Sequence, residues 1–210
     1  MALAPLVWLV DGAALDDAQL AGYLHWLSPS EQTRYGAFVR RERRRQFVIG
    51  RVLLRQMLGR LLDLPAEGVV LQERTAAAPQ LDHPAAAAIG LSISHSGPWV
   101  ACAASLDSKV GLDIEVVDPA RDIGALAEQA FTQEERDWLA ARPLASRTRD
   151  FYDMWCAQEA RIKLGRASAL HTAALGTAQL AIALCCSTVQ TQAPALVLRA
   201  LDDQSTPKSK

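Results

Sequence analysis

The sequence has little of several features that would mark a specialised class of protein. It has four cysteines in 210 residues, and none of them forms a C-x-x-C pair. Because a disulfide scaffold would need more cysteines at closer spacing, we predict reduced thiols. No run approaches the roughly 20 apolar residues of a membrane span, and the apolar start MALAPLVWLVDG lacks the basic region of a signal peptide. These absences predict a cytoplasmic protein without a membrane partner.

The chain also lacks a large net charge. The value is -1 at pH 7, so no overall basic field favours nucleic-acid binding. The charge is unevenly placed, because residues 40–45 read RRERRR. Arg44, Arg51 and Arg55 also fall on one side of a helix expected over 43–62. This basic segment is a candidate anion-binding surface, although such a stripe could equally be ordinary solvated surface.

Hydrophobic periodicity and turn residues predict a mixed α+β fold. We expect helices over 15–27, 43–62, 125–141 and 147–165, and strands over 6–10, 69–72, 91–95, 99–104, 110–117 and within 175–201. Ser28, Pro29 and Glu31 have the spacing of a capping box with proline at the first helical position. Tight turns join the three consecutive strands between 91 and 117, which predicts an antiparallel meander.

The segment VGLDIEVVD at 110–118 places two carboxylates in an otherwise apolar run. Alternate side chains of a strand point to opposite faces, so Asp113 and Glu115 share a face, with their Cα atoms roughly 7 Å apart. Like charges this close repel unless water or a cation lies between them. A hard divalent cation such as Mg²⁺ would satisfy both. An edge strand with its acids in solvent is the alternative.

Two further features involve residues that could act on a ligand. Glu159 and Lys163 lie one turn apart on the helix expected over 147–165, a spacing that is usually surface decoration worth about 0.3 to 0.5 kcal/mol. His95 ends a predicted strand beside a turn, where its ring and backbone donors could face a ligand together.

Three segments together resemble the signature motifs of a known family. They are SISHSGPW at 92–99, VGLDIE at 110–115 and WCAQEARIK at 155–163. With the segment at 27–55, in which basic residues run into a Leu-rich helix, they resemble the 4'-phosphopantetheinyl transferases of the surfactin-synthetase (Sfp) type. The resemblance extends over residues 6–165 and thins after them.

The resemblance implies an α+β fold of two pseudo-twofold-related halves, each a small antiparallel sheet packed on a long helix. Residues 1–105 would carry the basic helix and the His motif, and residues 106–210 the metal acids and the catalytic helix. The polar tail 202–210 is expected to be disordered. Coenzyme A would lie in the cleft between the halves, and a monomer would suffice to build it.

The resemblance also implies an activity. The family transfers the 4'-phosphopantetheine arm of coenzyme A to a serine hydroxyl of an apo acyl, peptidyl or aryl carrier protein, as in secondary metabolism. It uses Mg²⁺, with Mn²⁺ as an alternative, and releases adenosine 3',5'-bisphosphate. The carriers are acidic, which a basic surface would favour. One alternative is a weakened paralogue that only binds a carrier or coenzyme A, and another is a metal-dependent phosphotransferase acting on a different nucleotide.

Site residues follow from the matching motif positions. Asp113, Glu115 and Glu159 match the metal-binding acids. Glu159 would also accept the serine proton, and Lys163 would stabilise the leaving nucleotide. The positions that match coenzyme A contacts are Arg34, Arg41, Arg45, Ser94, His95, Asp113 and Lys163, with the arginines and His95 near the 3'-phosphate.

The sequence departs from the family pattern at two positions. Gln158 stands where a lysine is usual, and Ala77, Ala78 and Pro79 replace a glycine-lysine-proline stretch. Each lysine, if it contacts phosphate, would be worth about 1 to 3 kcal/mol of binding. The additional arginines could compensate for both.

Overall fold

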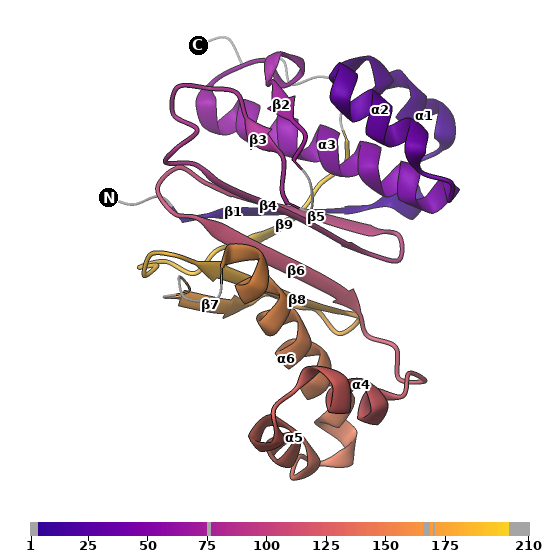
Figure 1. Ribbon diagram of the computed structural model, residues 1–210, viewed down its shortest axis with the longest axis vertical. Coiled ribbons are helices and arrows are strands. Elements are labelled where there is room, and N and C mark those ends of the chain that lie inside the picture. Colours follow the sequence, from indigo (N-terminus) through magenta and orange to yellow (C-terminus); the bar gives the residue numbers. More distant parts are fainter. Residues whose placement is uncertain (1–3, 75–76, 166–168, 170, 202–210) are drawn as a thin grey trace.

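The computed structural model describes residues 4–74, 77–165, 169 and 171–201. The fold is α+β, as predicted, and its layers follow the order helix, sheet, sheet, helix (Figure 1). The segment 202–210, predicted to be a disordered tail, lies outside the described residues. The division into halves at residue 105 stays a prediction.

The first sheet has the strand order β4-β5-β1-β9. Strand β1 (Leu6–Asp11) pairs antiparallel with β5 (Trp99–Ser105), and β5 pairs antiparallel with β4 (Gly90–Ser96). Strand β9 (Leu196–Leu198) runs parallel to β1 at the edge of the sheet. The predicted hairpin between β4 and β5 is confirmed. It turns at Gly97, whose φ of 53° lies in the region that favours glycine.

Helix α3 (Arg41–Leu62) covers the outer face of this sheet, with α1 (Asp17–Gly22) and α2 (Pro29–Ala37) beyond it (Figure 1). The helix predicted over 43–62 is therefore confirmed. The helix predicted over 15–27 is shorter, because α1 ends at Gly22 and a 3-10 turn follows. The core between α3 and the sheet contains Trp8, Val10, Val52, Leu53, Met57, Val100 and Cys102.

The predicted capping box at the start of α2 is confirmed. The Glu31 amide donates to Ser28 Oγ at 3.4 Å, and the Ser28 amide donates to Glu31 Oε2 at 2.9 Å. Pro29 occupies the first turn, where no intrahelical donor is needed.

The second sheet has the order β6-β8-β7 and stacks on the inner face of the first. Its strands are β6 (Val110–Val116), β8 (Leu180–Cys186) and β7 (His171–Ala174), all antiparallel to their neighbours. The predicted meander is wrong at its third strand, since β6 pairs with β8. Strand β5 has no free edge for β6, because β4 and β1 already occupy both sides.

Helix α6 (Leu144–Leu164) covers the outer face of the second sheet (Figure 1). Helices α4 (Ile123–Ala130) and α5 (Gln133–Ala140) pack near its N-terminal half. The single helix predicted over 125–141 is interrupted, because Thr132 and Glu135 form a capping box that starts α5.

Short elements complete the described chain. They are the 3-10 turns Gly12–Ala14, Leu24–Trp26 and Ala66–Gly68 (η1, η2 and η3) and the paired strands β2 (Leu71–Gln72) and β3 (Gln80–Leu81). All four cysteines are buried free thiols. Among the described helices, none combines the length and apolar character needed to cross a bilayer.

Candidate anion-binding site where the two sheets meet

Serine side chains connect β4 of the first sheet to β6 of the second. Ser92, Ser94 and Ser96 alternate along β4 and direct their hydroxyls to β6. Ser92 Oγ accepts from the Leu112 amide at 3.0 Å, and Ser96 Oγ accepts from the Val116 amide at 3.1 Å. The residues SISHS at 92–96 therefore connect the two sheets through hydrogen bonds of their serine side chains.

The same serines contact the two predicted acids. Asp113 and Glu115 share one face of β6, opposite the apolar side chains between the sheets, as predicted. Ser94 Oγ donates to Asp113 Oδ1 at 2.9 Å, and Ser96 Oγ donates to Glu115 Oε2 at 2.7 Å. Asp113 is only 6% exposed, so it does not face bulk solvent as the edge-strand alternative required.

Lys163 brings a cation to this pair from the last turn of α6. Its Nζ donates to Asp113 Oδ1 at 2.8 Å, Ser94 Oγ at 2.9 Å and Leu112 O at 3.0 Å. The helix can lie this close to β6 because of Gly111, where a Cβ atom would sit 2.0 Å from the Ala160 carbonyl oxygen. Glycine at this position therefore sets the approach of Lys163 to Asp113.

The carboxylates fit a divalent cation in part. Asp113 Oδ2 is buried and has no hydrogen-bond partner in the described part of the chain. Burial raises the pKa of Glu115, while the hydrogen bond from Ser96 opposes that rise. An unpartnered carboxylate oxygen beside a second acid suits a hard cation. The third predicted ligand, Glu159, lies half-buried on α6.

The three predicted acids do not form a preassembled cage. Within residues 4–74, 77–165, 169 and 171–201, no three His, Cys, Asp or Glu side chains are grouped so that they could hold a metal ion. The three-acid metal site stays a prediction.

A pocket of about 420 Å³ lies beside Lys163. Its wall combines polar, aromatic and charged side chains from α2, α3, β4 and α6 with the segment 77–79. The charged residues on this wall are Arg34, Arg43, Arg51 and Lys163, and no Asp or Glu of the described chain lines it. A wall with four cations and no carboxylate favours an anionic ligand.

His95, predicted to contact the ligand, lies in this wall and is held by Arg43. Arg43 Nη1 is 2.5 Å from His95 Nε2. A guanidinium group can only donate, so the imidazole nitrogen accepts. Burial, with the neighbouring Arg43 charge, lowers the pKa of His95 to about 4. The ring is therefore neutral near pH 7.

Arg43 is not among the residues that the sequence predicts to contact the ligand, and Arg51 is predicted only as one member of a basic stripe. Helical periodicity could have identified both arginines, because the residues of α3 that line the pocket recur at intervals of three and four and so share one face of the helix. They are Arg43, Gln46, Phe47, Gly50 and Arg51.

Two of the three predicted arginines point elsewhere. Arg34 lines the pocket, whereas Arg41 and Arg45 both form ion pairs with Asp17 of α1. Hydrogen bonds from these arginines, that of Arg41 being the larger cause, hold the pKa of Asp17 below its ordinary value. The structure thus brings Arg34 to His95 and Lys163, and places the other two beside a separate hollow of about 400 Å³.

The two departures from the family pattern have different locations. Ala77, Ala78 and Pro79 line the pocket. Gln158 is not among the lining residues, and its Nε2 donates to the Ala130 carbonyl oxygen at 3.1 Å, at the end of α4. Of the two departures, therefore, only the replacement at 77–79 changes the pocket wall.

An α+β protein with a cationic pocket next to two partly buried carboxylates has the features of a phosphate-ligand-binding protein. Comparison with protein families gives the particular class. Residues 109–194 match the model of the 4'-phosphopantetheinyl transferase superfamily, and residues 16–107 match that of the 4'-phosphopantetheinyl transferase N-terminal region. The chain belongs to the 4'-phosphopantetheinyl transferase superfamily.

Curated relatives agree with this assignment. The chain is 30% identical to 4'-phosphopantetheinyl transferase HetI of Nostoc, over 70% of this chain and 62% of the relative. It is 31% identical to 4'-phosphopantetheinyl transferase gsp of Aneurinibacillus migulanus, over 65% and 55%. It is 29% identical to 4'-phosphopantetheinyl transferase Sfp of Bacillus subtilis, over 67% and 61%. The chain thus spans between half and two thirds of the length of these relatives.

Proposed function

We propose that this protein transfers the 4'-phosphopantetheine arm of coenzyme A to a serine hydroxyl of an apo carrier protein. The carrier would be an acidic acyl, peptidyl or aryl carrier, and the reaction would depend on Mg²⁺ or Mn²⁺. The observation that carries the proposal is the ion pair of Lys163 with Asp113 at the edge of a pocket with four cations. It supports the proposal because cationic side chains that suit a diphosphate lie beside carboxylates that suit a divalent cation.

The reaction exchanges one phosphorus–oxygen bond for another. The serine oxygen bonds to the phosphorus that carries pantetheine, and the bond from that phosphorus to the adenosine 3',5'-bisphosphate oxygen breaks. Negative charge grows on the leaving phosphate, where Lys163 can stabilise it by donating hydrogen bonds. Glu159 is the proposed acceptor of the serine proton, directly or through one water.

Asp113 and Glu115, with Glu159, are the proposed ligands of the divalent cation. When bound, such a cation neutralises diphosphate charge that would otherwise repel the nucleophile. The arginines of the pocket and His95 would bind the nucleotide end of coenzyme A, where guanidinium donors suit phosphate oxygens.

The test is the intact mass of carrier proteins after incubation with this protein, coenzyme A and Mg²⁺. We expect apo acyl, peptidyl or aryl carriers to gain the mass of one phosphopantetheine group. A carrier with its acceptor serine replaced by alanine serves as the control, and a chelator should prevent the gain. Binding of coenzyme A without any mass gain would instead support the binding-module alternative.

A further inference from the structure

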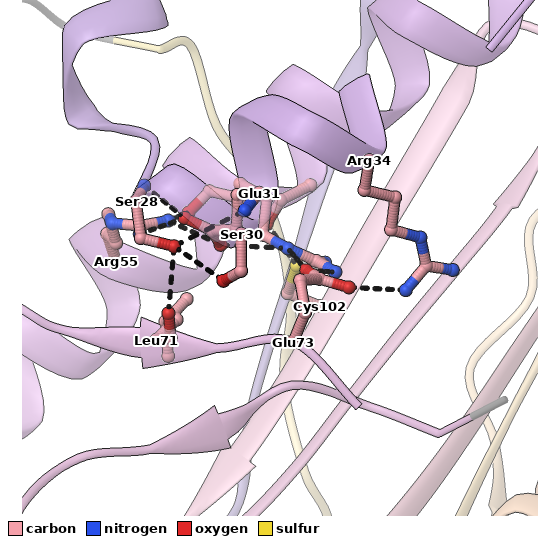
Figure 2. A network of polar contacts seen from close by, with 10 residues as sticks. Ser28, Ser30, Glu31, Arg34, Arg55, Leu71, Glu73 and Cys102 are labelled. Atoms are coloured by element: carbon pink, nitrogen blue, oxygen red, sulfur yellow. Dashed lines mark hydrogen bonds and ion pairs between the residues drawn. The ribbon is translucent and has the colours of Figure 1, made fainter. Parts of the chain in front are cut away.

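A chain of alternating charges connects α3 to α2 (Figure 2). Its members are Arg55, Glu31, Arg51, Glu73 and Arg34, each contacting the next. Two of its members, Arg34 and Arg51, line the pocket. Glu31 is fully buried, with Arg55 Nη2 at 2.5 Å and Arg51 Nε at 3.0 Å. Three cations and two anions leave one net positive charge in this network.

Glu73 is the outer acid and contacts both arginines that reach the pocket. Its Oε1 accepts from Arg51 Nη2 at 2.5 Å and from Arg51 Nε at 3.0 Å, and its Oε2 accepts from Arg34 Nη1. In Figure 2, Arg34 extends from α2 toward this carboxylate. The side chains of Arg51, Glu73 and Arg34 are 7%, 12% and 42% exposed. Exposure therefore rises along the network toward the pocket.

Phe47 contacts the same two guanidinium groups. The Arg51 Cζ atom lies 4.5 Å from the centre of the Phe47 ring, and the Arg34 Cζ atom lies 5.8 Å from it. A guanidinium fixed by a carboxylate and a ring has little freedom left to lose when a ligand binds. In the described part of the chain, Arg51 Nη1 and Arg34 Nη2 have no hydrogen-bond partner, so each keeps donors for a ligand.

We propose that Glu73 is a positioning residue that fixes Arg34 and Arg51 at the pocket wall, where both bind the 3'-phosphate of coenzyme A. The inference rests on the proposed function and assigns Arg51 to the ligand. It also explains how the pocket binds an anion with Ala78 in place of the usual lysine. Ala78 lines the same pocket as the two arginines, and their held guanidinium groups supply the missing charge.

Removing Glu73 has two opposing effects. Its carboxylate repels an incoming phosphate, but both oxygens already accept from guanidinium groups, which neutralise that charge. Arg34, in contrast, forms no other ion pair in the described part of the chain. Without Glu73, only the contact with the Phe47 ring, whose centre lies 5.8 Å from the Arg34 Cζ atom, would restrain its half-exposed side chain. Loss of positioning should therefore dominate, and phosphate binding should weaken.

The test compares the binding of coenzyme A with that of 3'-dephospho-coenzyme A, measured by calorimetry. Glu73→Gln keeps the shape of the side chain and removes its charge. We expect it to reduce the preference for coenzyme A about tenfold, the range of a charge-assisted hydrogen bond. In the transfer assay, KM for coenzyme A should rise while kcat stays within about twofold. Glu67→Gln, an exposed acid in η3, is the matched control and should change neither quantity.

Arg34→Ala provides an independent variant on an exposed side chain. It should lower the same preference, and Glu73→Gln should have a smaller effect in the Arg34→Ala background than in the wild type. Equal loss of affinity for both ligands, or independent effects of the two substitutions, would assign Glu73 a purely structural role. If the wild type transfers phosphopantetheine but Glu73→Gln and Arg34→Ala keep full preference, only this inference fails. A wild type that binds neither ligand would overturn the proposed function as well.

Discussion

Lys163 of α6 and Asp113 of β6 form an ion pair, with Nζ 2.8 Å from Oδ1, at the edge of the cationic pocket. The family resemblance implies coenzyme A contacts for both residues and a metal-ligand role for Asp113 in addition. An anion bound in the pocket would compete with Asp113 for Lys163, and a cation bound at Asp113 would compete with Lys163 for the carboxylate. Either ligand would therefore break the same ion pair. Binding of the two ligands should therefore be mutually favourable, because each frees the partner that the other needs.

Asp113→Asn should abolish metal-dependent transfer and retain the fold. The amide keeps one acceptor oxygen for Ser94 and Lys163 but loses the charge. Because Asp113 is buried, we expect the free energy of unfolding to fall by about 1 to 3 kcal/mol, as for a lost charged hydrogen bond. Urea denaturation and the carrier mass assay measure the two effects, with Glu134→Gln as a surface control. Full transfer activity in Asp113→Asn would refute the metal site.

Arg43→Ala and Arg41→Ala should differ, although the two arginines are two positions apart on α3. Arg43 lines the pocket and holds His95, whereas Arg41 is paired with Asp17 outside it. We expect KM for coenzyme A to rise about tenfold in Arg43→Ala and less than about twofold in Arg41→Ala. Equal effects in initial-rate measurements would contradict the helical phase assigned to this segment.

The stability of the protein should fall on acidification, in part because of His95. Its pKa is lowered to about 4 in the folded chain, compared with about 6.5 in an unfolded one. The unfolded chain therefore binds more protons between these values, and stability decreases as pH falls from about 6.5 to 4. Solvent screening at this partly buried ring limits the effect to about 1 to 2 kcal/mol.

Urea denaturation of wild type and His95→Gln at several pH values measures this contribution. The variant should lose less stability than the wild type between pH 6.5 and 4. His25→Gln, at an exposed position, should retain the wild-type dependence. Identical profiles for wild type and His95→Gln would show that the ring is not held neutral by the fold.

Gln158→Lys should leave KM for coenzyme A unchanged. The side chain at this position contacts the end of α4 and does not line the pocket, so a restored lysine would add its charge away from the ligand. A lysine can still interact with the carbonyl groups at a helix C-terminus, so stability should change by less than about 1 kcal/mol. A clearly lower KM in initial-rate measurements would place this residue near the phosphates.

Periodicity and capping motifs in the sequence predicted most of the helices and strands. They also predicted that the two carboxylates of the site share one face of a strand. Alternation along β6 put Asp113 and Glu115 on the same face, and the capping box fixed the start of α2. Prediction failed where the alternatives were long-range. Nothing in β6 itself indicates that its partner is β8, because that choice depends on β5 having both edges occupied. The break before α5 did have a local signal, the Thr132-to-Glu135 spacing.

The sequence by itself determined the family, the α+β class and the residue types available for phosphate chemistry, because motif order and periodicity are properties of the chain. The tertiary structure decided which cations share a pocket. Arg41, Arg43 and Arg45 are near-identical neighbours in sequence, but about 100° of rotation per residue along α3 sends only Arg43 toward His95. Tertiary packing also brought Glu73 into contact with Arg34 and Arg51. The sequence could not predict these ion pairs, because no local rule connects residues so far apart along the chain.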